Sequence, residues 1–300
     1  MHPLLWPLLM MMMMMMTWQL GEAEDKVCIQ CATPTMKENW ASSGLPNRPA
    51  GLKYDKKCAN PDSTFTADAL SSNCVSSCFE LMVPVDGVYG FVRGCHEHFA
   101  WDEMKVTVSN ASVICEINQV PDYGSVGFLT RDGETLTTVY AGTSFCQPTL
   151  PTSDDGLCNK KLADTDVSEK GVTGCSSGSV HTCKSCGEYD GTGSCSASTS
   201  GTCKAAYCTK TIGKMNGHSY ESRGCASFNP FARDVCSWSD QTFNVSTGVD
   251  TASRSKRGVS FSLQASQCFC QGELCNSTPR FAALPFVAVA AISTSFLVLP

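Results

Sequence analysis

Between two long apolar ends, the chain contains short stretches in which apolar and polar residues alternate. Such alternation puts successive side chains on opposite faces of a strand and predicts half-buried β-sheet. In the region 83–92, apolar, β-branched and aromatic residues flank an Asp-Gly pair at 86–87, which is typical of a two-residue hairpin turn. Similar stretches cover 106–117, 126–140 and 259–263. No window has apolar residues at helical spacing, so the pattern predicts an all-β fold.

The N-terminal apolar run indicates a targeting segment. Residues 3–18 are almost wholly apolar, and residues 1–21 contain no Asp, Glu, Lys or Arg. The small residues Gly21 and Ala23 suit signal peptidase, so we expect residues 1–23 to be a signal peptide cleaved after Ala23. The alternative is a buried amphipathic helix, for which a methionine run is poor material because this side chain specifies packing weakly.

The C-terminal apolar run indicates a lipid anchor. Residues 281–300 carry no charge and follow small polar residues, as in signals for a glycosylphosphatidylinositol (GPI) anchor. We expect residues 277–300 to be removed and the lipid to be attached to Asn276, with Ser277 as the next choice. A tail retained in the membrane is the alternative.

Composition and charge then restrict the class of protein. The chain has 300 residues, of which 20 are cysteine and 17% are charged, and its formal net charge is −6. A general nucleic-acid binder needs a basic surface for phosphates, so this class is disfavoured. Disulfides persist in secreted and cell-surface proteins, and sequons at Asn110 and Asn244 predict N-glycosylation in that compartment. We therefore expect the mature chain on the outer leaflet of the plasma membrane.

The cysteine pattern is duplicated along the chain. The opening Cys-x2-Cys at 28–31 recurs at 183–186, and the segment 74–95 recurs as 203–225. Both segments begin with a close pair of cysteines, and both end in Arg-Gly-Cys. Two copies of one module explain this repetition better than chance does.

A polar stretch rich in Gly and Ser separates the two copies and predicts a linker at residues 161–182. The first module then covers residues 24–160, and the second covers 183–276. A Cys-Asn pair also recurs, at 158–159 and 275–276. Little apolar sequence is present for the length of each module, so we expect cross-links to compensate for a small core.

The second module resembles the ten-cysteine three-finger domain of the urokinase-receptor and lymphocyte-antigen superfamily. The resemblance rests on the opening Cys-x2-Cys, the closing Cys-x4-Cys-Asn and the anchor signal that follows. It implies a small disulfide-rich all-β fold with two three-finger (snake-toxin-like) domains in tandem, each a knot of disulfides from which three β-hairpins project. For the second module it implies the pairs Cys183–Cys208, Cys186–Cys195, Cys203–Cys225, Cys236–Cys268 and Cys270–Cys275.

The first module departs from the family pattern. The penultimate family cysteine is missing, and the long interval between Cys31 and Cys58 predicts an enlarged first finger. Cysteine order in the family implies the pairs Cys28–Cys78, Cys31–Cys58, Cys74–Cys95 and Cys115–Cys146. Cys158 and Cys175 are left over, and we expect them to pair with each other.

Three further motifs have a functional and a structural interpretation. The Cys-x2-Cys pairs suit zinc or redox chemistry, but in a secreted chain we expect disulfide halves. His96 and His98 would share one face of a strand and suit a metal; no third ligand is identifiable, so a polar surface is favoured and no metal is predicted. The sequence Arg254-Ser-Lys-Arg257 matches a proprotein-convertase site, and the alternatives are a basic contact loop and a solvated loop.

We expect no enzyme activity and no cofactor, because the chain has no His-Glu-x-x-His motif and no nucleotide-binding glycine loop. The resemblance implies a GPI-anchored surface protein that binds an extracellular protein ligand or modulates a membrane receptor or ion channel. The alternatives are a structural surface-coat glycoprotein and a secreted inhibitor or toxin-like ligand. The expected contact loops comprise Val85, Asp86, Gly87, Val88, Lys214, Met215, Asn216, His218, Arg254, Lys256 and Arg257.

Overall fold

The computed structural model describes residues 26–85, 87–109, 113–121, 129–131, 134–136, 138–150, 157–160, 162, 166–168, 171–196, 201–246 and 258–277. The predicted signal peptide lies outside these residues, as do residues 278–300 of the predicted anchor signal, the sequon residue Asn110 and the predicted contact residues Asp86, Arg254, Lys256 and Arg257. The described residues form a disulfide-rich, mainly β structure. None of their helices is both long enough and apolar enough to cross a membrane.

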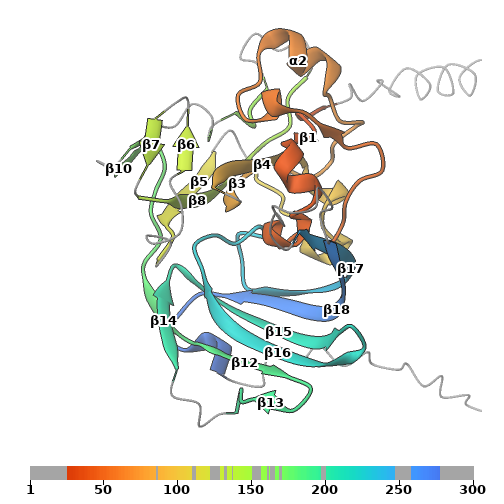
Figure 1. The fold of residues 1–300 in the computed structure, drawn as a ribbon. Coiled ribbons are helices and arrows are strands. Elements are labelled where there is room, and N and C mark those ends of the chain that lie inside the picture. Colours follow the sequence, from red (N-terminus) through yellow and green to blue (C-terminus); the bar gives the residue numbers. More distant parts are fainter. Residues whose placement is uncertain are drawn as a thin grey trace, which may run out of the picture.

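The first half of the chain forms an eight-stranded sheet in the order β2-β1-β4-β3-β8-β5, with β6 beside β4 and β7 beside β6. The bounds are β1 Cys31–Ala32, β2 Lys53–Tyr54, β3 Cys78–Val85, β4 Val88–Cys95, β5 Ile114–Gln119, β6 Leu129–Arg131, β7 Glu134–Leu136 and β8 Tyr140–Cys146. The hairpin β3–β4 is central and turns between Val85 and Val88, which confirms the prediction for 83–92. Figure 1 shows this sheet in orange to yellow-green.

The second half forms a six-stranded sheet in the order β13-β12-β16-β15-β18-β17, drawn in green to blue in Figure 1. Its strands are β12 Cys186–Tyr189, β13 Thr192–Gly193, β15 Tyr207–Met215, β16 His218–Ala226, β17 Val235–Ser246 and β18 Gly258–Cys270. Three hairpins build it, namely β12–β13, β15–β16 and β17–β18. The predicted alternating stretch at 259–263 is part of β18.

Short elements complete the fold. Two small sheets pair β9 (Asp166–Ser168) with β10 (Gly171–Thr173) and β11 (His181–Lys184) with β14 (Thr202–Ala205). The helices are α2 (Ser63–Asp68) and the 3-10 helices η1 (Pro34–Lys37), η2 (Trp40–Ser43), η3 (Lys56–Cys58), η4 (His96–His98), η5 (Asp102–Met104) and η6 (Cys275–Ser277). Helix α2 begins where the Asp62 side chain accepts a hydrogen bond from the Phe65 main-chain nitrogen at 2.7 Å.

Two predicted strands differ in extent from the observed ones. The stretch 106–117 yields a strand only from Ile114, and residues 106–109 form an irregular segment beside Ser77, the residue before β3. One such contact is the hydrogen bond from the Val108 nitrogen to the Ser77 hydroxyl, at 2.7 Å. The stretch 126–140 yields the short hairpin β6–β7 and then the first residue of β8.

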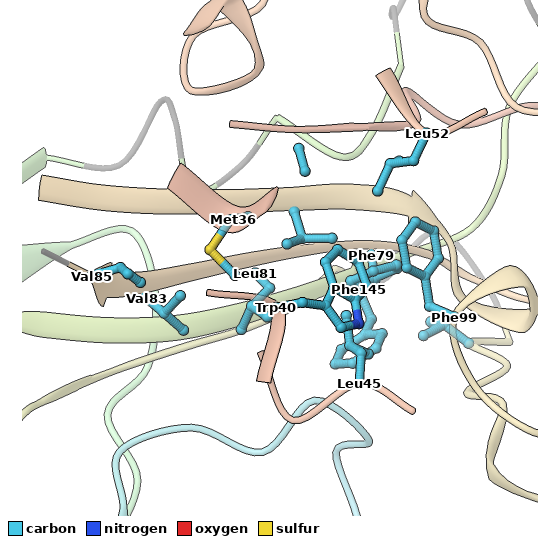
Figure 2. Close-up of a cluster of buried hydrophobic side chains, with 13 residues drawn as sticks. Met36, Trp40, Leu45, Leu52, Phe79, Leu81, Val83, Val85, Phe99 and Phe145 are labelled. Atoms are coloured by element: carbon cyan, nitrogen blue, oxygen red, sulfur yellow. The ribbon is translucent and has the colours of Figure 1, made fainter. Parts of the chain in front are cut away.

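The first sheet has a larger apolar core than its sequence suggests. Between Cys31 and Cys58 the sequence predicts an enlarged β-finger, but this segment folds mainly as 3-10 turns laid against the sheet. Its apolar side chains pack on those of the central strands (Figure 2). The buried cluster comprises Ala32, Met36, Trp40, Leu45, Leu52, Phe79, Leu81, Val83, Val85, Val92, Phe99, Val108 and Phe145. Among the described residues, the buried cluster formed by the second module alone consists of six disulfide cysteines, so that module has less apolar core to stabilise it.

All 20 cysteines lie within the described residues, and each is in a disulfide. Eight of the ten predicted pairs are present: Cys28–Cys78, Cys31–Cys58, Cys74–Cys95, Cys183–Cys208, Cys186–Cys195, Cys203–Cys225, Cys236–Cys268 and Cys270–Cys275. Three disulfides cluster into a hub in each module, and the hairpins start from these hubs. The hubs are Cys28–Cys78, Cys74–Cys95 and Cys146–Cys158 in the first module and Cys183–Cys208, Cys203–Cys225 and Cys270–Cys275 in the second.

The predicted pairs Cys115–Cys146 and Cys158–Cys175 are wrong. The structure contains Cys146–Cys158 and Cys115–Cys175 instead. Strand register explains the difference. In the second module Cys236 lies opposite Cys268, two residues before the hub cysteine Cys270.

In the first module, the position equivalent to Cys268 is not a cysteine. Cys115 lies opposite Ser144, which is two residues before the hub cysteine Cys146. The Ser144 hydroxyl is buried without a hydrogen-bond partner, as expected where the other module has a sulfur atom. Cys115 therefore bonds to Cys175, and Cys146 is left to close the hub with Cys158.

Candidate functional site

The asparagine after the last hub cysteine closes each module in the same way. The Asn159 amide accepts from the Ile29 nitrogen at 3.1 Å and donates to the carbonyl oxygens of Ile29 and Phe79 at 2.8 and 3.2 Å. Each of these two residues directly follows a hub cysteine. Asn159 is fully buried.

Asn276, the predicted lipid-bearing residue, repeats this arrangement. Its amide accepts from the Lys184 nitrogen at 2.9 Å and donates to the carbonyl oxygens of Lys184 and Thr209 at 3.0 and 2.9 Å. Lys184 and Thr209 also follow hub cysteines, so the two closing asparagines are structural equivalents. The side chain of Asn276 is thus a buried structural group, and the anchor prediction concerns only its main-chain carbonyl.

The predicted contact residues of β15–β16 lie at a well-formed hairpin tip. Asn216 and Gly217 have φ angles of +52° and +83°, as a type I′ turn requires. The Asn216 nitrogen donates to the Ser262 carbonyl at 2.7 Å, and its side-chain oxygen accepts from the Ser262 nitrogen at 2.8 Å, so the neighbouring strand fixes the tip. Lys214, Asn216 and His218 are exposed.

The predicted contact loop of β3–β4 differs from the β15–β16 tip. Val85 is buried in the core and offers no side chain to a partner, which corrects its prediction as a contact residue. It is buried because it extends the core-facing row of β3. Val88 is half-buried and pairs with Thr130 of β6, and Gly87 has a φ of +75° in the turn.

Direct contacts join the two modules. The Tyr207 hydroxyl of β15 donates to the Glu116 carboxylate of β5 at 2.9 Å. Burial, followed by the charge of Glu116, raises the pKa of Tyr207. The Asn118 amide donates to the Ser227 carbonyl at 2.8 Å, and the Ser227 hydroxyl donates to the Gln119 carbonyl at 3.0 Å.

His96 also contacts the second module and is fully buried. Its Nδ1 accepts from the Val106 nitrogen at 2.9 Å, so the neutral ring carries its proton on Nε2 and donates to the Pro230 carbonyl at 2.9 Å. The rings of Phe79 and Phe231 pack edge-on against it at centroid distances of 5.3 and 6.0 Å. Burial lowers the pKa of His96 from the ordinary 6.5 to about 4.

A cleft of about 530 Å³ lies between the modules. Its walls include Val83 and Val120 from the first module and Thr209, Phe228 and Phe269 from the second, and no lining residue carries a charge. This volume falls in the range of small-molecule and side-chain pockets. A smaller cavity of about 160 Å³ shares part of its wall and is bounded by Met215, so this predicted contact residue lines a cavity.

The described residues contain no convincing metal centre. The three groups of potential metal ligands all include disulfide-bonded cysteines, which are not thiolates. The predicted alternative of a His96–His98 metal pair does not fit, because η4 is helical and both nitrogens of His96 are in hydrogen bonds. The His98 ring contacts the Gln30 side chain at 2.7 Å.

One short stretch, Gly-Cys-Ser-Ser-Gly at 174–178, matches the serine-hydrolase pattern Gly-x-Ser-x-Gly. That pattern has catalytic meaning at a strand-to-helix turn with an exposed serine. Here Ser176 is exposed, but it pairs with Glu116 in an isolated β-bridge and is followed by irregular chain and then β11, not by a helix. Its hydroxyl donates to the Cys115 carbonyl at 2.9 Å. The stretch therefore ties the inter-module segment to β5.

No protein-family model, curated protein or solved structure matches the chain. The three-finger resemblance therefore rests on the cysteine pattern and the processing signals in the sequence.

Proposed function

We propose that the protein is a GPI-anchored cell-surface protein with two three-finger modules, and that it binds an extracellular protein or modulates a membrane receptor or channel. The observation that carries this proposal is the repeated hub of three disulfides with a closing asparagine. A cross-linked hub holds its hairpins in place before a partner arrives, so little conformational entropy is lost on association. Two joined modules can also bind one partner at the same time.

The anchor is tested on intact cells that express the full-length chain. Phosphatidylinositol-specific phospholipase C is expected to release the protein, and mass spectrometry of the released form identifies the lipid-bearing residue, Asn276 in the proposal. A matched chain with residues 277–300 replaced by a transmembrane segment should stay on the cell. Retention of the natural chain after treatment would remove the anchor from the proposal.

Binding is tested through the exposed tip of β15–β16. Proximity labelling on living cells identifies neighbours, and the phospholipase-released protein is then titrated with each purified neighbour. Replacing Lys214, Asn216 and His218 by alanine is expected to weaken binding by about tenfold or more, since preorganised tips supply the contacts. Lys56→Ala, an exposed change on η3 of the first module, is the matched control. An unchanged affinity in the tip variant would contradict a fingertip mode of binding.

A further inference from the structure

Two tryptophans lie together on the surface where the modules meet. The side chains of Trp101 and Trp238 are 41% and 54% exposed, whereas Trp40 is buried in the core. The Trp101 indole nitrogen donates to the Trp238 carbonyl oxygen at 3.1 Å. This bond keeps the Trp101 ring beside β17, the outermost strand of the second sheet.

The side chain of Trp238 points away from the inter-module cleft. Directly opposed residues share one face of a sheet, and Trp238 lies opposite Ser266. The neighbouring residues Ser239 and Gln267, which lie on the other face, line the cavities between the modules. Asp240, two positions after Trp238, shares the outer face and is exposed. The tryptophan surface is therefore separate from the cleft.

Exposed acidic residues lie next to each tryptophan in the chain or along its strand. Asp102 and Glu103 directly follow Trp101, and both are exposed. Lys105 approaches Asp102 at 3.6 Å, but Glu103 and Asp240 have no ion pair within the described residues. The nearby Arg233 donates to the main-chain oxygen of Glu103 rather than to its carboxylate. We name Trp101, Asp102, Glu103, Trp238 and Asp240 the tryptophan patch.

We propose that the tryptophan patch is a docking surface for a basic segment of an extracellular protein partner. An arginine or lysine of that segment rests on the indole faces, which attract cations, and its charged end reaches Glu103 and Asp240. Tryptophan is enriched among the residues that dominate binding energy at interfaces. The net charge of −6 attracts a basic partner at longer range. This inference rests on the proposed binding function and adds the chemistry of the partner.

The test uses the full-length chain expressed in secretory cells with 5-fluorotryptophan, observed by fluorine NMR. The probe is acetyl-Arg-Ala-Arg-amide, and acetyl-Gln-Ala-Gln-amide is the neutral control. We expect the arginine peptide to shift the signals of Trp101 and Trp238 and to leave that of Trp40 in place. Added salt should weaken the response, since part of the attraction is electrostatic.

Variants assign the response to the patch. Trp238→Ala and Asp240→Asn are each expected to lower the affinity for the arginine peptide by about threefold or more. Tyr189→Ala is the matched control, because Tyr189 is 40% exposed on β12, four strands away from β17. Circular dichroism and the absence of free thiols establish that each variant is folded.

Three results would overturn the inference. They are no shift up to about 10 mM peptide, equal shifts with the glutamine peptide, and an equal loss in Tyr189→Ala. A response to phosphatidylcholine vesicles or to a second copy of the chain, but not to the arginine peptide, would assign the patch to those occupants instead. If the arginine peptide does not bind the tryptophan patch while the β15–β16 tip variant still has a lower affinity for its partner, the docking inference is wrong and the proposed function stands.

Discussion

Residues of the repeated Arg-Gly-Cys motif have distinct structural roles. The buried Arg93 guanidinium donates to the Cys58 carbonyl at 2.8 Å and also to the Asn159 carbonyl. In the second module, Arg223 donates to the Ser277 carbonyl at 3.0 Å. Both arginines thus hold the main chain just after the closing disulfide, and this long-range contact is a reason for the motif to recur.

The glycine of the motif is constrained in only one module. A side-chain carbon at Gly94 would overlap the ring of Phe99, whereas one at Gly224 would meet only the Thr209 hydroxyl at 3.6 Å. We expect Gly94→Ala to lower the free energy of unfolding by about 1–3 kcal/mol, because overpacking forces the ring aside. Gly224→Ala, the matched control, should change it by less than about 0.5 kcal/mol. Urea denaturation of both variants checks this, and equal effects would contradict the packing argument.

At the scale of elements, β5 is an edge strand that the inter-module segment covers. The Ile117 nitrogen donates to the Ser176 carbonyl at 2.9 Å, and the Ser176 nitrogen donates to the Cys115 carbonyl at 3.0 Å. The disulfide Cys115–Cys175 begins this attachment. Edge strands with open hydrogen-bonding groups invite pairing with other chains, and this attachment occupies the edge.

Restoring the missing cysteine should redirect this disulfide. In the double variant Ser144→Cys with Cys175→Ser, Cys115 faces a cysteine in the register that Cys236 and Cys268 occupy in the other module. We expect a disulfide between Cys115 and the introduced thiol at position 144, with no free thiol left, which non-reducing peptide mapping and thiol titration measure. Free thiols at both positions would show that register does not decide the pairing. The single variant Cys175→Ser, with one unpaired cysteine, is the control.

The sequence predicts those elements that depend on neighbouring residues. The hairpin at 83–92 follows from the turn at 86–87, and all pairs of the second module follow from cysteine order within a resembling family. The bridge Cys115–Cys175 was not predictable in this way, because it depends on which residue of β8 faces Cys115. The turns between Cys31 and Cys58 do not follow from the local sequence either, since their shape comes from packing on β3 and β4.

At the scale of the whole molecule, His96 links the two modules by accepting from Val106 and donating to Pro230. Protonation at Nδ1 would bring two hydrogen-bond donors, this nitrogen and the Val106 nitrogen, face to face. It would also place a positive charge among aromatic rings. The nearby Arg233 further disfavours that charge. The sequence singled out His96 for its spacing from His98, but its role depends on contacts 134 positions away in the chain.

The free energy of unfolding should therefore depend on pH through His96. The unfolded ring titrates near 6.5 and the folded ring at a pKa of about 4, so the unfolded state binds the proton more tightly. The contribution of His96 to the free energy of unfolding is fully present above pH 6.5. It is lost as the pH decreases from 6.5 to about 4, by about 3 kcal/mol in total. Denaturant titrations followed by tryptophan fluorescence across this range measure the change.

Two variants isolate the contribution of His96. His96→Asn removes the titrating ring, so this part of the pH dependence should disappear even if the variant is less stable at every pH. The variant His98→Gln should retain the pH dependence that His96 causes, and it is the matched control. An unchanged pH dependence in His96→Asn would assign the loss of stability to other groups.

The bridge Cys115–Cys175 also determines which proteolytic cuts can separate the two modules. It joins positions separated by 60 residues and ends just before the second module. A protease that cuts once between these cysteines leaves both fragments covalently attached, so the two modules stay joined. Release of the first module by a single cut therefore requires cleavage after Cys175, in the few residues before Cys183, and the hydrogen bonds of Ser176 and Gly178 to β5 protect part of that segment.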